Sequence, residues 1–133
     1  MTDRLESAAG DARGRAYCPY SGFAVGAALE AEDGRLFTGC NVECVSYGLT
    51  LCAERAAIGA AVSAGARRFR RLVVLTDTDP PATPCGACRQ LLAEFGAALE
   101  VDCIGRSARR SFTLAELLPV AFDSIGLHPQ GGR

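Results

Sequence analysis

The sequence predicts an α/β protein, a three-layer α/β/α sandwich in which a mixed sheet of about five strands lies between helices. Three observations support this prediction. A strong hairpin signal at Asp33-Gly34 indicates two antiparallel strands. After the hairpin, segments typical of strands alternate with segments typical of helices. Hydrophobic residues make up 49% of the 133 residues, which is enough for a sizeable core.

The first half of the chain is expected to contain a helix, the hairpin and a second helix. The first helix is expected at residues 3–16, and the hairpin strands at 23–31 and 35–42. The segment 52–66 is rich in alanine, the strongest helix former, so it is expected to be a helix that begins near Cys52.

The second half continues the alternation. The apolar run at 72–76 is bounded by turn-forming residues and indicates a buried central strand. The remaining elements are expected as a helix at 85–95, a strand at 99–104, a short edge strand at 110–113, and a short helix at 113–118 with Glu116 in the capping-box position. Residues 1–133 are expected to form a single domain, with a disordered tail from about residue 126.

Charge and composition argue against several kinds of partner. The formal net charge is −1, which gives no reason to expect binding to nucleic acid or to an anionic membrane. The arginine-rich run at 67–71 is best interpreted as cations near a helix C-terminus on a solvated surface. Residues 1–15 are charged and lack the apolar core of a secretory signal, so a cytoplasmic location is expected.

The chain has seven cysteines, and the odd number without a signal peptide favours metal binding over a disulfide framework. Three of them belong to two short motifs, Cys52-Ala53-Glu54-Arg55 and Pro84-Cys85-Gly86-Ala87-Cys88-Arg89. Three thiols and one carboxylate suffice for a catalytic zinc site with an open fourth position and an adjacent acid/base. The other four, Cys18, Cys40, Cys44 and Cys103, are expected to act as small buried apolar residues.

Spacing indicates how the two motifs can meet. Cys85 and Cys88 are three residues apart and share a helix face. Cys52 and Glu54 are two apart, so in mid-helix they would point roughly 200° apart and could serve one site only at a helix start. Two helix N-termini are therefore expected to meet at the metal, where their dipoles favour thiolate over thiol.

Two arginines follow the cysteines at helical spacing. Arg55 lies three residues after Cys52, and Arg89 lies four after Cys85. Guanidinium donors on the sulfurs would offset the excess negative charge of three thiolates around one zinc ion. The alternative is that both arginines lie on a solvated helix surface. The single histidine, His128, lies in the tail, which leaves the proton chemistry to Glu54.

A polar pair closes the second predicted strand. Alternation places Asn41 and Glu43 on one face of that strand, where an amide and a carboxylate could bind vicinal hydroxyls of a sugar. The alternative interpretation is an ordinary polar strand end.

Longer motifs in a fixed order identify a family. They are Tyr20-Ser21-x-Phe23-x-Val25-Gly26-Ala27-Ala28, Gly39-Cys40-Asn41-Val42-Glu43, Ser46-Tyr47-Gly48, the two cysteine motifs extended to Gln90, and Leu117-Leu118-Pro119 followed by Phe122. On these motifs, which run from about residue 17 to 123, the chain resembles the small, homotetrameric cytidine deaminases.

The resemblance implies a cytidine deaminase-like fold and the hydrolytic deamination of cytidine and 2′-deoxycytidine in pyrimidine salvage. It implies one Zn²⁺ per subunit, held by Cys52, Cys85 and Cys88, with Glu54 as proton shuttle. It further implies roles in substrate binding for six residues: Asn41 and Glu43 on the ribose 3′ side, Phe23 stacked on the pyrimidine, Ala53 and Tyr47 near the ligand, and Phe122 reaching into a neighbouring subunit's site. Cys44 departs from the family pattern after the glutamate and alters the expected pocket wall.

Four other interpretations stay open at this point. A structural zinc module results if Cys40 or Cys44 completes the metal shell. Cys85 and Cys88 alone fit a thioredoxin-like redox pair. Within the deaminases, the alternatives are a nucleic-acid base editor and an enzyme for a modified cytosine nucleoside such as a blasticidin-type antibiotic.

Overall fold

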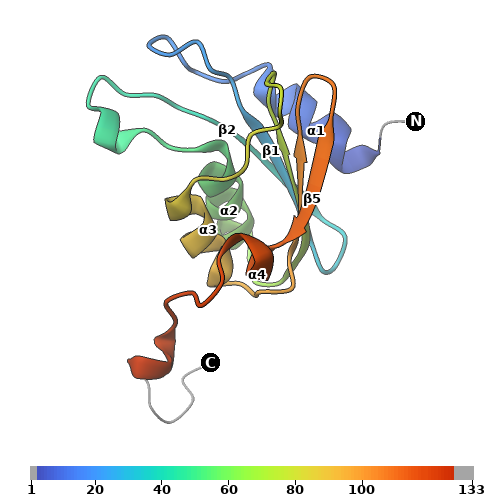
Figure 1. Cartoon of the computed structure of the whole chain (residues 1–133), viewed down its shortest axis with the longest axis vertical. Coiled ribbons are helices and arrows are strands. Elements are labelled where there is room, and N and C mark those ends of the chain that lie inside the picture. The colour runs from blue at the N-terminus through green and yellow to red at the C-terminus, as the bar shows by residue number, and fades with distance from the viewer. Residues whose placement is uncertain (1–2, 128–133) are drawn as a thin grey trace.

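The structure is a computed structural model that describes residues 3–127. A five-stranded sheet forms its middle layer, with the strand order β2-β1-β3-β4-β5 (Figure 1). The strands are β1 Gly26–Ala31, β2 Leu36–Cys40, β3 Phe69–Leu75, β4 Glu100–Ile104 and β5 Arg109–Thr113. β3 and β4 pair in parallel, and the other three neighbouring pairs are antiparallel. The predicted mixed sheet is confirmed.

Helices cover both faces of the sheet, so the predicted three layers are also confirmed. On one face lies α1 (Arg4–Arg13), while α2 (Ala53–Ser63) and α3 (Gly86–Ala93) lie on the other (Figure 1). Alternate residues of the strands face the two helix layers, because successive side chains of a strand point to opposite sides. The central strand β3 is fully buried at Leu72 and Val73, as the apolar run predicts.

Short elements complete the described chain. The helix α4 (Leu114–Leu117) begins with the predicted capping box, in which Thr113 and Glu116 satisfy each other's backbone N–H groups. Two single-turn 3₁₀ helices are η1 (Tyr47–Leu49) and η2 (Ser124–Gly126). Of the tail predicted to be disordered from about residue 126, residues 128–133 lie outside the described residues. No helix within residues 3–127 combines the length and the apolar character needed to cross a membrane.

The hairpin forms at Asp33-Gly34 as predicted, and Gly34 takes a positive φ of 93° there. Its strands are shorter than predicted at the end away from the turn. At that end the side chain of Asn41 bonds the backbone of Phe23 and of Val25. These side-chain bonds are made where further strand pairing was expected, so the segment before β1 is held beside residue 41 without being part of the ladder.

The arginine run at 67–71 is divided among several partners. Arg67 donates to the carbonyl oxygen of Val62 in the last turn of α2, which confirms the predicted interaction with a helix C-terminus, and to that of Ala66 after the helix. Arg71 departs from the prediction of a solvated surface: it is half-buried and pairs with Asp102 at 2.6 Å and with Asp3 at 2.9 Å. The run is therefore tied into the fold by ion pairs.

Gly39 allows α2 to lie directly on β2. A Cβ atom at Gly39 would clash with the carbonyl oxygen of Ala53 and would lie 2.5 Å from the backbone nitrogen of Ala57. We expect Gly39→Ala to lower the free energy of unfolding by about 2–3 kcal/mol, because backbone atoms cannot move aside cheaply. Urea unfolding followed by circular dichroism measures this loss.

Gly59→Ala is the matched control for this substitution. Gly59 is exposed in the middle of α2, and a Cβ atom there meets nothing within 4 Å. Alanine at this position should stabilise the protein by about 0.5–1 kcal/mol, because glycine is the poorer helix former. Equal unfolding midpoints for the two variants would contradict the close packing of α2 on β2.

Candidate metal centre and active site

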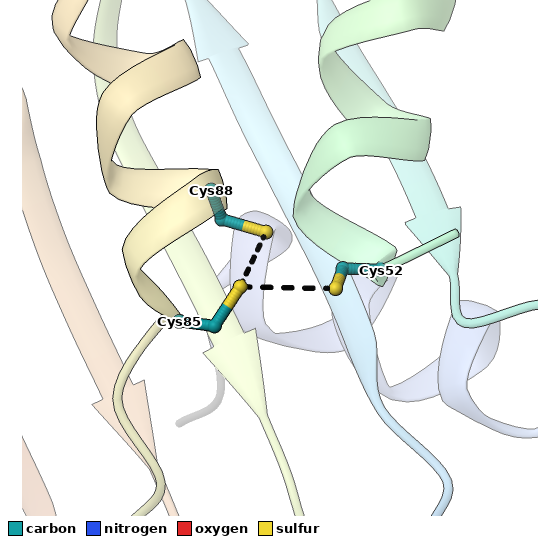
Figure 2. Close-up of side chains that lie close together, drawn as sticks. All are labelled: Cys52, Cys85 and Cys88. Carbon is teal, nitrogen blue, oxygen red and sulfur yellow. Dashed lines mark hydrogen bonds between the residues drawn. The ribbon is translucent and has the colours of Figure 1, made fainter. Parts of the chain in front are cut away.

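Three thiols converge where two helices begin. Cys52 is the N-cap of α2, Cys85 is the N-cap of α3, and Cys88 lies in the first turn of α3. The Sγ atom of Cys85 lies 3.9 Å from that of Cys52 and 3.5 Å from that of Cys88. Figure 2 shows the three sulfurs pointing toward one another from the two helix starts. The prediction that both motifs open helices and meet is confirmed.

The sulfur positions suit a zinc ion. A tetrahedral zinc with zinc–sulfur bonds of about 2.3 Å places its sulfurs about 3.8 Å apart. All three Sγ atoms lie within 4.8 Å of one another, and the separations of 3.5 and 3.9 Å bracket the ideal value. Among the described residues, this cluster has three members, and neither Cys40 nor Cys44 belongs to it. A set of three protein ligands leaves one tetrahedral position open, as catalytic sites require.

The surroundings shift the pKa values of Cys85 and Cys88 in opposite directions. Burial raises the pKa of Cys85, but the N–H groups of Cys88 and Ala87 at the start of α3 and the two neighbouring thiols outweigh burial, so the net pKa is lowered. Burial, followed by the charge of Glu54, raises the pKa of Cys88 far above its usual range. A divalent cation reverses this preference, because it stabilises the thiolate form directly.

Arg55 lies against the sulfurs, as predicted. One of its Nη atoms donates to the carbonyl oxygen of Thr50 at 3.0 Å and to the Sγ of Cys52 at 3.6 Å. The hydrogen bond with Cys52 raises the pKa of Arg55. Its Nε atom is buried and makes no hydrogen bond within residues 3–127. A half-buried cation beside this cluster fits three thiolates better than three neutral thiols.

Arg89 differs from the prediction that both arginines donate to the sulfurs. Its Nε donates to the carbonyl oxygen of Pro84, and its two Nη atoms donate to the carbonyl oxygen of Leu117 and to the hydroxyl of Thr83. These bonds go to the loop before α3 and to α4, not to a sulfur. Side chains on a helix lean toward its N-terminus, and Arg89 is close enough to the start of α3 to reach past it.

A cavity of about 240 Å³ opens beside the thiols. Its lining residues come from the segment before β1, the end of β2, the start of α2, the end of β3 and the loop before α3. They are Phe23, Val25, Asn41, Glu43, Thr50, Cys52, Ala53, Glu54, Val74, Thr76, Ala82, Thr83 and Cys85. The cavity thus joins two thiols, the buried carboxyl and four of the six predicted substrate-binding residues.

Glu54 lines this cavity from the first turn of α2 and is 5% exposed. Burial raises the pKa of Glu54, and this effect exceeds the opposing influence of its own backbone N–H and of Arg55. A carboxyl with a raised pKa holds a proton more readily than an ordinary one, which suits general acid/base chemistry. The geometry therefore places a proton carrier at the wall of the cavity that also holds Cys52.

Asn41 and Glu43 share the cavity wall at the end of β2. Asn41 accepts a hydrogen bond from the N–H of Val25 at 2.9 Å and donates to the carbonyl oxygen of Phe23 at 2.7 Å. Glu43 accepts the N–H groups of Tyr20 and Ser21 and the hydroxyl of Ser21. The Ser21 hydroxyl is the main cause that lowers the pKa of Glu43, so this carboxylate stays ionised.

Two predicted substrate-binding residues lie outside the cavity of their own chain. Tyr47 is 73% exposed and lines an adjoining hollow of about 250 Å³ with Tyr20, Ser21, Glu43 and Thr50. Phe122 lies in the segment after α4, where its carbonyl oxygen accepts from Gln90. It lines a separate cavity formed with α3 and α4. A single chain therefore brings together Phe23, Asn41, Glu43 and Ala53, but not Tyr47 and Phe122.

The sequence predicts no role for the hydroxyl groups at the cavity. Thr50, Thr76 and Thr83 line the cavity, and Ser21 touches it through Glu43. Serine and threonine are frequent in turns for local reasons, so their presence there carries no functional signal. Only spacing offered a signal: Thr50 stands two positions before Cys52, and Thr83 stands two positions before Cys85.

Known proteins resemble this chain in both sequence and structure. A family model described as the zinc-binding region of cytidine and deoxycytidylate deaminases matches residues 2–101. The cytidine deaminase of Sporosarcina psychrophila is 48% identical over 94% of this chain and 93% of its own length. The cytidine deaminase of Mycobacterium tuberculosis strain H37Rv is 49% identical over 89% of this chain and 86% of its own. A crystal structure of the Burkholderia pseudomallei cytidine deaminase superposes with a TM-score of 0.87 at 48% identity, covering 92% of this chain and all of that one.

Proposed function

Because this chain belongs to the cytidine deaminase family, we propose that it converts cytidine and 2′-deoxycytidine to uridine and 2′-deoxyuridine with release of ammonia. It is an enzyme of the hydrolase class, and its cofactor is zinc. The observation that carries the proposal is one cavity of about 240 Å³ whose wall contains two of the three thiols of the cluster, Cys52 and Cys85, and the buried carboxyl of Glu54.

Cys52, Cys85 and Cys88 are the proposed ligands of one zinc ion per chain. When bound, zinc supplies a Lewis acid that lowers the pKa of water to near neutrality. Arg55 offsets the negative charge of the thiolates through its bond to Cys52. The same three residues without an adjacent carboxyl could serve a structural site, and the placement of Glu54 in the cavity wall favours catalysis.

Glu54 is the proposed proton shuttle. It takes a proton from the attacking water and passes it to N3 of the cytosine ring, which makes C4 electrophilic. The water oxygen forms its bond to C4. Glu54 then takes the second proton of that water and delivers it to the amino group. The bond between C4 and this nitrogen breaks, and ammonia leaves with the bonding electron pair. Both protons of one water are thereby accounted for, one on N3 and one on ammonia.

The hydrogen-bonding capacity left over at Asn41 and Glu43 suits a sugar hydroxyl. An amide nitrogen carries two protons, and Asn41 uses one of them on Phe23. A carboxylate has about four acceptor sites, and Glu43 uses three of them on Tyr20 and Ser21. One N–H of Asn41 and one acceptor site of Glu43 are therefore unused, and a single hydroxyl can bond to both. We assign them to the 3′-hydroxyl, with Phe23 and Ala53 against the pyrimidine.

The charges around the cavity favour a free nucleoside over a nucleotide. The matching family model covers deaminases of both cytidine and deoxycytidylate. None of the described residues that line the cavity or the adjoining hollow is lysine or arginine. Such cations are the usual partners of a phosphate group, and the carboxylate of Glu43 repels it. The same lack of cations argues against a nucleic-acid substrate.

We place the enzyme in the cytoplasm, in the salvage of pyrimidine nucleosides, as a single-domain homotetramer with sites at subunit interfaces. The seven described cysteines are all free, which suits a reducing compartment. Tyr47 and Phe122 are 73% and 72% exposed, and the segment after α4 extends away from the sheet (Figure 1). In a tetramer these aromatic side chains can complete the sites of neighbouring subunits. Light scattering tests the assembly, and a monomer that is fully active would refute it.

A panel of substrates tests the proposed reaction. We expect rapid loss of cytosine absorbance with cytidine and with 2′-deoxycytidine, and rates at least about 10²-fold lower with deoxycytidylate, because its phosphate would face a carboxylate without a cation nearby. Free cytosine, a blasticidin-type nucleoside and a single-stranded oligonucleotide complete the panel. Preference for any of these over cytidine would overturn the assignment.

A further inference from the structure

The hydroxyl of Ser21 joins two residues that line the cavity, Glu43 and Phe23. Its Oγ donates to one carboxylate oxygen of Glu43 and accepts the backbone N–H of Phe23 at 2.9 Å. The backbone N–H of Ser21 adds a bond of 3.1 Å to the other oxygen of Glu43. Ser21 therefore contacts both the carboxylate of Glu43, which is assigned to the sugar, and the backbone of Phe23, whose ring is assigned to the base.

The direction of these hydrogen bonds is determined by the groups involved. A backbone N–H can only donate, so the Ser21 oxygen must accept from Phe23. A carboxylate can only accept, so the single hydroxyl proton of Ser21 goes to Glu43. The bonds form a directed chain from the Phe23 N–H through the Ser21 hydroxyl to the Glu43 carboxylate. Bonds in such a chain polarise and strengthen one another.

The Glu43 carboxylate is restrained from several directions. Its first oxygen accepts two backbone N–H groups, from Tyr20 at 3.0 Å and from Ser21, and its second accepts the Ser21 hydroxyl. The backbone N–H of Glu43 is held by the carbonyl oxygen of Tyr17 at 2.9 Å. Without the hydroxyl, the second oxygen has no protein donor in this set, and the carboxylate can turn about its last torsion. The free acceptor site would then lose its direction toward the cavity.

We propose that Ser21 is a positioning residue for sugar recognition: its hydroxyl orients Glu43 so that one carboxylate acceptor faces the nucleoside's 3′-hydroxyl. The inference rests on the proposed function, because it takes a nucleoside as the ligand. Ser21 itself does not touch the reacting atoms. Its effect should therefore depend on whether the ligand carries the hydroxyl that Glu43 binds.

Two product nucleosides that differ only in the 3′-hydroxyl provide the test. Competitive inhibition constants of 2′-deoxyuridine and 2′,3′-dideoxyuridine are measured against cytidine turnover by the zinc-loaded enzyme. We expect Ser21→Ala to raise the constant of 2′-deoxyuridine about tenfold and that of 2′,3′-dideoxyuridine by no more than about twofold. Ser21→Thr keeps the hydroxyl and should restore both constants to within about twofold of the parent enzyme.

Each outcome decides between specific alternatives. Equal increases for the two nucleosides would overturn the proposal, since they would show that Ser21 acts through Phe23 and the base. Unchanged constants for both would overturn it as well. Ser107→Ala, at an exposed serine in the turn between β4 and β5, is the control and should change neither constant. Should the parent enzyme fail to deaminate cytidine, the proposed function fails; should it succeed without the sugar-dependent effect, only the role of Ser21 fails.

Discussion

Glu54→Gln should bind zinc as well as the parent protein does and turn over cytidine at least about 10³ times more slowly. Glutamine keeps the size of the side chain and its place in the first turn of α2. It cannot carry a proton from water to the base, so both proton transfers lose their carrier. Metal analysis gives the zinc content, and the loss of cytosine absorbance gives kcat at saturating cytidine.

The control for this variant is another carboxyl-to-amide change on the same chain. Glu100 is exposed at the start of β4, away from the cavity, so Glu100→Gln should retain the parent rate. A Glu54→Gln enzyme that keeps more than about a tenth of the parent kcat would exclude Glu54 as the obligatory shuttle. Loss of zinc from this variant would also be informative, because it would show that the carboxyl supports the metal site itself.

Cys88→Ser should remove zinc and the stability that zinc provides. Cys88 is fully buried in the first turn of α3, and its Sγ lies 3.5 Å from that of Cys85. We expect zinc content to fall from one ion per chain to below about a tenth of that, and deamination to fall to background. Zinc at about a thousand times its dissociation constant stabilises a folded protein by roughly 4 kcal/mol. The parent should therefore unfold at a lower temperature once a chelator is added, and the variant should not respond.

Cys18→Ser provides the matched control, because Cys18 is half-buried and lies outside the thiol cluster. That variant should keep both zinc and the response to the chelator. If Cys88→Ser bound one zinc ion per chain with unchanged activity, the assignment of the three ligands would be wrong. If instead it lost only thiol–disulfide exchange, the redox interpretation of Cys85 and Cys88 would gain support.

Much of the fold was predictable because its signals are local. Asp33-Gly34 predicts a two-residue turn, and Thr113 with Glu116 predicts a helix start; both act within a few residues. The central strand followed from an uninterrupted apolar run, since a strand buried on both faces has no polar side. The predicted hairpin strands were too long because the side chain of Asn41 bonds the backbone of the segment before β1, and no strand propensity reports that contact.

The site was predictable in its chemistry and less so in its supporting contacts. Helical spacing placed Arg55 correctly on Cys52. The same rule was wrong for Arg89, because it predicts a shared face and cannot say which acceptors a long side chain finds beyond the helix start. Ser21 was part of a recognised motif, but its role was not predicted, because its bond to Glu43 joins residues 22 positions apart in the sequence. Tyr47 and Phe122 remain predictions, since one chain places both away from its own thiols.

From residue types and local spacing alone, the chain determines a metal site of three thiols beside one carboxyl, and a mixed sheet to carry it. The ability to bind a metal depends on the side chains themselves, and the helix and strand periods relate residues that are close in the sequence. The tertiary structure decided which hydroxyls line the cavity and which acceptors Arg89 binds. It also decided that Glu43 keeps an acceptor site and Asn41 an N–H group for a ligand. Those outcomes depend on how distant segments meet, and a hydrogen bond depends on distance and angle that no spacing rule supplies.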